Sequence, residues 1–156
     1  MADLLIGIHA ALGEFAIFAA LWIAVEMLNP TPQRLRRAKI ASLLLVVFIF
    51  ASWLAGGWYY VNVYGAQVKP LIKEGPQPWA HGIFTETKEH VFLFLPFLGI
   101  FLASLLRVGD ARLLKERRLQ RAVLVLAAVI FLVGLGMVGM GYIISTGARS
   151  ALEVGA

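Results

Sequence analysis

The sequence predicts an all-α integral membrane protein, folded as a four-helix up-and-down bundle of two hairpins in a single domain over residues 1–156. Composition gives the first reason. Hydrophobic residues make up 60% of the chain and charged residues only 15%, whereas soluble domains are about half apolar and about a quarter charged. The second reason is that the apolar residues gather in four continuous runs, without the alternation typical of membrane strands. We therefore expect the lipid bilayer to be the main partner of the chain.

We interpret the four runs as helices because a membrane-spanning helix needs about 20 apolar residues. The third run is the exception, since Val91 to Leu106 offers only sixteen residues. We expect this helix to begin near Glu86, which draws Glu86, Glu89 and His90 to the membrane edge. The predicted helices cover residues 4–28, 40–60, 86–106 and 122–145, and residues 61–85 form the predicted outer loop.

The placement of charge predicts the orientation of the bundle. Ten of the 14 Lys and Arg residues lie in the first and third connections, and the positive-inside rule places such loops in the cytoplasm. The chain is then N-out and C-out in an inner, cytoplasmic membrane. Glu26 lies at the inner end of the first helix, and we expect it to pair with Arg34, Arg36 or Arg37.

The sequence excludes several functional classes. The net charge of +5 comes from the two basic connections and does not indicate a nucleic-acid partner. The chain has no cysteine, which excludes thiolate metal sites and covalently attached c-type haem. It contains no nucleotide-binding fingerprint and no nucleophile elbow. We predict no catalytic residues, and an electron-transfer or accessory subunit rather than a stand-alone enzyme.

The three histidines all fall on the predicted outer side. His9 lies one turn into the first helix, His90 opens the third, and His81 lies in the loop before it. Two neutral imidazoles at one depth can ligate the iron of a haem b, so His9 and His90 are the candidate ligands. Gly13 would leave room for the macrocycle, and Glu86 and Glu89 would orient the ligands.

Helical spacing predicts which faces point inward. In the first helix the predicted packing stripe begins at His9 and Gly13 and ends at Met27. In the third helix it begins at Glu86 and His90. The full predicted stripes are His9, Gly13, Ala16, Ala20, Ile23 and Met27, and Glu86, His90, Leu93, Phe97, Ile100 and Ser104.

Other interpretations of the polar residues stay open. Imidazole and carboxylate together suit a transition-metal site for Cu, Zn or Fe, built from His9, His90 and Glu86. Glu14 is a candidate proton site, because an ionisable residue inside a membrane helix is costly unless it is paired or wetted. In the remaining interpretation the chain binds no cofactor and is a scaffold subunit of a larger complex. Its expected partners are other membrane or periplasmic subunits, or further copies of itself.

Overall fold

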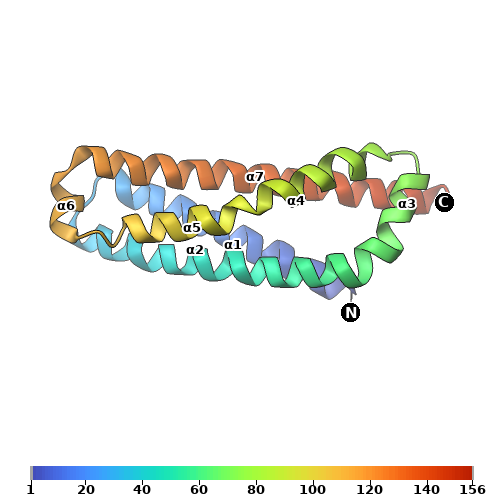
Figure 1. Ribbon diagram of the computed structural model, residues 1–156, viewed down its shortest axis with the longest axis horizontal. Coiled ribbons are helices and arrows are strands. Elements are labelled where there is room, and N and C mark those ends of the chain that lie inside the picture. Colours follow the sequence, from blue (N-terminus) through green and yellow to red (C-terminus); the bar gives the residue numbers. More distant parts are fainter. Residues whose placement is uncertain (1, 156) are drawn as a thin grey trace.

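The computed structural model describes residues 2–155, and the described residues form helices and turns without strands (Figure 1). Four helical stretches are long and apolar enough to cross a membrane: Leu4–Leu28, Pro32–Glu74, Ala80–Leu105 and Arg117–Glu153. The all-helical prediction and the four long apolar helices are thus confirmed. The elements are α1 (Ala2–Leu28), α2 (Pro32–Tyr59), η1 (Tyr60–Val68), α3 (Lys69–Glu74), η2 (Ala80–Thr85), α4 (Glu86–Phe92), α5 (Phe94–Leu105), α6 (Asp110–Lys115) and α7 (Arg117–Glu153).

The first hairpin joins α1 to α2 through a short proline-bounded turn. Thr31 caps α2, because its hydroxyl accepts a hydrogen bond from the Arg34 N–H at 3.2 Å. Pro32 follows at the first helical position, where a missing N–H costs nothing. The stripe predicted for the first helix is confirmed over its inner part, since Ala20, Ile23 and the other members from Ala16 to Met27 are buried.

Glu26 anchors the turn end of this hairpin. Its carboxylate accepts hydrogen bonds from Trp22 Nε1 at 3.0 Å and from Arg34 Nε at 2.9 Å, and Arg37 Nε lies 2.7 Å from one of its oxygens. The residue is only 6% exposed. The predicted pairing is confirmed for Arg34 and Arg37, and these bonds compensate for the burial of the charge.

The segment predicted as an outer loop, residues 61–85, is mostly helical, so that prediction is wrong. The second helix continues without a break through η1 and α3 to Glu74, and η2 begins at Ala80. Pro70 stands in the first turn of α3, directly after π-helical η1, and the chain stays helical through this junction. Both η1 and η2 are π-helical. This geometry is rare, and local sequence patterns do not predict it.

The third long helical stretch begins at Ala80, earlier than the predicted start near Glu86, and it is broken and turned relative to the prediction. Leu93 separates α4 from α5, and Pro96 cannot donate the helical bond to the Phe92 carbonyl. The predicted inward stripe is wrong, since Glu86, His90, Leu93, Phe97, Ile100 and Ser104 are all exposed. The buried positions are Leu95, Pro96, Gly99, Leu102 and Ala103.

The four long helices form a ring in which α1 contacts α2 and α7, and α5 contacts α2 and α7. The first and third membrane helices are therefore diagonal, as expected for an up-and-down bundle. Towards the end that carries α3, here called the α3 end, α4 and η2 lie against α7 and apart from α2 (Figure 1). The helices thus splay into two layers at this end, α1 with α2 and α4 with α7.

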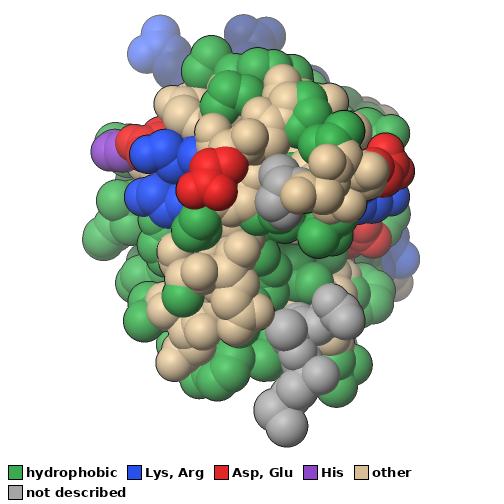
Figure 2. Space-filling view, turned by 90° about the vertical axis from the view of Figure 1, so that its right-hand side faces the viewer, with side chains coloured by type: hydrophobic (Ala, Val, Ile, Leu, Met, Phe, Trp, Pro, Cys, Tyr) green, Lys and Arg blue, Asp and Glu red, His purple; other side chains and the backbone are tan. Residues whose placement is uncertain are grey.

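The two ends of the bundle differ in charge. Seen from the α3 end, the surface is mostly hydrophobic or uncharged; charged side chains of both signs lie at its left and right, and further Lys or Arg side chains stand out at the top (Figure 2). The opposite end, here called the α6 end, carries the ten basic residues of the first and third connections. At that end Lys39 pairs with Asp110, and Arg107 donates to the Ser42 hydroxyl at 3.2 Å.

Candidate functional site

Two adjoining cavities occupy the wedge between the splayed layers. The smaller, about 430 Å³, is lined mainly by α1 and α7, and the larger, about 650 Å³, mainly by α2, η1 and α4. His9, Lys88 and Phe92 line both cavities. Both volumes lie within the range of about 300–1,000 Å³ that is typical of small-molecule sites.

His9 forms the floor of the wedge and is held by α2. Its Nδ1 lies 2.8 Å from the Ser52 carbonyl oxygen and 3.0 Å from the Ser52 hydroxyl, which itself donates to the His9 carbonyl at 2.9 Å. A carbonyl oxygen only accepts, so Nδ1 carries the proton. In the neutral ring Nε2 then bears the free lone pair, which is how protein scaffolds prepare an imidazole for iron or metal.

Gly56 makes room for this ring. A Cβ at position 56 would stand 2.5 Å from His9 Nδ1 and 2.7 Å from Cε1, closer than Cβ atoms come to other heavy atoms in proteins. The neighbouring Gly57 has no such constraint, since nothing lies within 4 Å of the point that a Cβ would occupy there. The His9 ring therefore needs glycine at 56 to pack against α2 as it does. Gly13 also lies beside Ser52, but a Cβ there would make only an ordinary contact with the Ser52 hydroxyl, at 3.5 Å.

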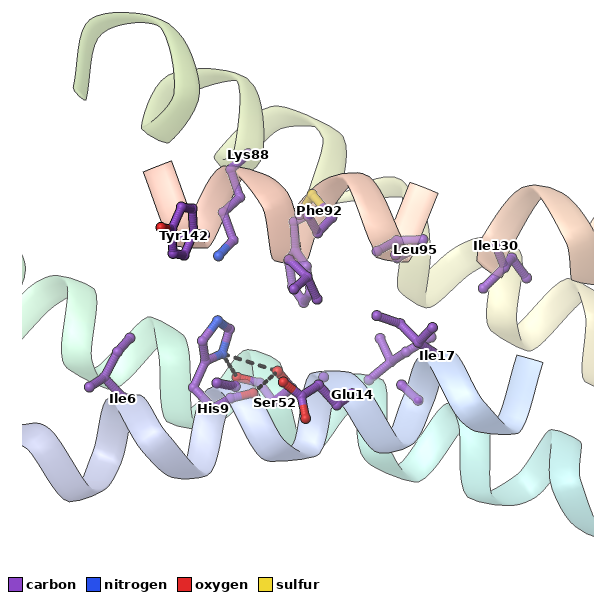
Figure 3. A pocket seen from close by; sticks show the side chains of 18 of the residues that line it. Ile6, His9, Glu14, Ile17, Ser52, Lys88, Phe92, Leu95, Ile130 and Tyr142 are labelled. Atoms are coloured by element: carbon purple, nitrogen blue, oxygen red, sulfur yellow. Dashed lines mark hydrogen bonds between the residues drawn. The ribbon is translucent and has the colours of Figure 1, made fainter. Parts of the chain in front are cut away.

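Lys88, Phe92 and Tyr142 come down from the opposite layer. In Figure 3 the Lys88 side chain reaches from α4 across the gap towards His9, with Phe92 and Tyr142 on either side. Its Nζ passes 3.1 Å from the Cβ position of Gly141 on α7, so a side chain at 141 would crowd the amine. The wedge thus places an imidazole on one wall and an amine on the other.

The carboxylates are spread around the wedge. Glu14 lines the smaller cavity from its edge and is exposed. Glu89 lines the larger cavity, with its Oε1 buried and without a hydrogen-bond partner among the described residues, and the Tyr60 phenol lies beside it. Glu86 stands outside, with its side chain 53% exposed.

His90 is placed differently from His9. It also borders the larger cavity, yet it is exposed, and its Nδ1 donates to the Glu86 carbonyl of its own helix at 2.6 Å. The predicted inward orientation of Glu86 and His90 is therefore wrong, because Lys88, Glu89 and Phe92 take the inward face of α4.

His81 belongs to a separate buried cluster at the α3 end. The Tyr64 hydroxyl lies 3.0 Å from His81 Nδ1 and 2.8 Å from the Thr85 hydroxyl, which donates to the Ala80 carbonyl. His81 Nε2 lies 3.6 Å from a Glu86 oxygen. The cluster links η1 to η2, and Tyr64 and Thr85 also line the larger cavity.

The structure does not assemble the predicted mixed metal site. Within residues 2–155, no group of three or more His, Asp or Glu side chains is close enough to hold a metal ion. Glu86 lines neither cavity, and its Oε1 lies 3.6 Å from His81 Nε2 instead. His9 and His90 both use Nδ1 on a backbone carbonyl and leave Nε2 available, but His9 is held inside the wedge by α2, whereas His90 lies at its exposed border.

Sequence reasoning missed Ser52, Lys88 and Tyr64, which shape the wedge. Ser52 and Lys88 belong to elements other than that of His9, and no motif sets either of them apart from an ordinary polar residue. Position 88 precedes Phe92 by four residues, so the two share a face, but only packing shows that this face is the inner one. Comparisons with models of protein families, with curated proteins and with solved structures find no match to this chain.

Proposed function

We propose that the protein is a membrane electron-transfer protein that would hold a haem b in the larger cavity, with His9 Nε2 as the atom that would bind it. The observation that carries the proposal is the His9 ring, held by Ser52 and Gly56 so that Nε2 faces the wedge. An imidazole whose Nδ1–H is given to a backbone carbonyl is ready to bind iron without further rearrangement.

The walls of the larger cavity fit such a group. They combine aromatic and aliphatic residues with glycines and a few polar groups, as cofactor sites do. The lining residues of this cavity come mainly from α2, η1, α4 and α7, with His9 on α1, so the group would stand between the two layers. A bound haem b supplies one-electron redox chemistry, while the chain positions it and excludes water.

The experiment is an optical spectrum of the detergent-extracted full chain supplied with haem. We expect a Soret band that shifts on reduction, and its loss in His9→Ala. His90→Ala is the comparison, because His90 borders the same cavity but is exposed, so we expect it to lower haem content less than His9→Ala does. Equal loss in both variants would instead support the pair of histidine ligands expected from the sequence.

Measurements on the same protein preparation distinguish two alternatives to the haem proposal. A metal without haem, found by elemental analysis, would support the transition-metal interpretation, although no three-ligand group supports it among the described residues. Protein that takes up neither haem nor metal would support the scaffold interpretation. The apolar outer surface of the helices suits contact with lipid or with other membrane subunits in either case.

We further propose an inner-membrane location with the α6 end in the cytoplasm and both termini outside. The concentration of basic residues at the α6 end supports this orientation. The wedge then lies near the outer face, where a periplasmic partner can exchange electrons with it. An engineered cysteine at Gln77 should react with an impermeant reagent from outside, and one at Gln33 should not; the opposite pattern would reverse the orientation.

A further inference from the structure

The smaller cavity is a second compartment of the wedge, which shares His9, Lys88 and Phe92 with the larger one and extends between α1 and α7. It opens sideways between α1 and α7, because several of its lining residues are also exposed, among them Ile6, Val138 and Tyr142. The surrounding surfaces of α1 and α7 are apolar, with exposed residues such as Phe15, Phe18, Val129 and Leu135. A ligand dissolved in the bilayer can therefore enter this compartment directly.

The polar side chains of this compartment include one amine, which donates hydrogen bonds, and one carboxylate, which accepts them. Lys88 reaches in from α4 beside Tyr142, and an amine donates hydrogen bonds whether or not it is protonated (Figure 3). Glu14 lies at the opposite edge on α1, where a carboxylate accepts. The rest of the lining consists mainly of apolar side chains and small residues, including Ile17, which packs against Gly134.

We propose that this compartment binds the head group of a lipid-soluble quinone. A quinone carbonyl accepts a hydrogen bond from Lys88, and the hydroxyl of the reduced form donates one to Glu14. The long apolar tail would leave between α1 and α7 into the bilayer. As a binding site it stands alone, but its role as the electron donor or acceptor rests on the proposed haem function.

The arrangement favours a neutral ring over a phospholipid. A phosphate would pair with Lys88, but the Glu14 carboxylate at the same compartment would repel it. A ring with an oxygen at each end satisfies both groups without bringing in a charge. The two redox forms also use the two groups differently, which a permanent lipid ligand would not.

The test is a binding titration of the detergent-extracted full chain, without and with haem, using decylubiquinone and its reduced form as probes. We expect saturable binding at one site per chain in both states. Lys88→Met removes the donor and should weaken quinone binding by about tenfold or more, the effect expected for a hydrogen bond involving a charged or strongly polar group. Glu14→Gln should weaken the binding of the reduced form more than that of the quinone.

If Lys88→Met folds poorly, two tryptophan variants of α7 test the binding site by blocking it sterically. Val138→Trp places a ring at the mouth of the compartment and should abolish binding. Val129→Trp is the matched control, since Val129 is an exposed valine of the same helix that lines neither cavity. Equal binding in the two tryptophan variants would overturn the proposal, as would a co-purifying phospholipid that the quinone does not displace.

The outcomes separate this proposal from the haem proposal. Quinone binding by protein that takes up no haem would support the site and remove its electron-transfer role. A haem spectrum with no saturable quinone binding would overturn the site and leave the proposed function in place.

Discussion

Substituting Glu26 by glutamine should destabilise the chain by about 2 kcal/mol. The substitution keeps the shape of the side chain but removes the charge that Arg34 and Arg37 share. Hydrogen bonds involving charged groups contribute about 1.5–3 kcal/mol each, and removing one partner of a fully buried pair costs about 3–5 kcal/mol. The Arg34 and Arg37 side chains are 27% and 54% exposed, so water recovers part of this loss.

The measurement is the unfolding temperature of the full chain in detergent. For chains of this size about 1 kcal/mol shifts the midpoint by about 2–4 °C, so we expect Glu26→Gln to melt about 4–8 °C lower. Glu116→Gln is the control, because Glu116 also pairs with an arginine at 2.8 Å but both side chains are well exposed. If Glu26→Gln melts at the same temperature as this control, the buried cluster does not stabilise the hairpin and the reasoning is wrong.

Three further predictions concern the α3 end and the surface. Gly56→Ala should displace the imidazole packed against it and lower haem content, whereas Gly57→Ala should not; equal haem in both variants would contradict the role of Gly56. Tyr64→Phe leaves buried His81 Nδ1 without its partner, while the Thr85 hydroxyl keeps its bond to the Ala80 carbonyl; the change should cost about 1–3 kcal/mol, measured as a lower melting midpoint, and an unchanged midpoint would show that the cluster adds nothing. Hydrogen bonding to Arg112 lowers the pKa of Glu116, so the pair stabilises the chain above the unfolded-state pKa and loses this contribution as pH falls through the folded-state value. The small melting difference between wild type and Glu116→Gln should therefore vanish in acid, and a difference that grows in acid would refute the sign.

The candidate site shows where sequence reasoning reaches its limit. His9 could be singled out because a histidine within an apolar run is conspicuous, and the small residues below it predicted a packing face. What fixes its ring, however, is the Ser52 carbonyl and the missing side chain of Gly56, both more than 40 residues away along the chain. No local pattern connects these positions, since only the pairing of α1 with α2 brings them together.

Local features of the chain are enough to predict the four long helices, the hairpin of α1 and α2, the inner packing face of α1, and the partners of Glu26. These follow from hydrophobic length, proline positions, small residues and nearby opposite charges, which act over short stretches of chain. The inward face of α4 and α5, the helical course of residues 61–85, and the meeting of His9 with Lys88 instead depend on how the helices pack. The physical reason is that a membrane helix is apolar all round, so its periodicity does not distinguish the face against lipid from the face against protein. That choice is made by the fit of one helix against another, as where Gly99 receives Ile49.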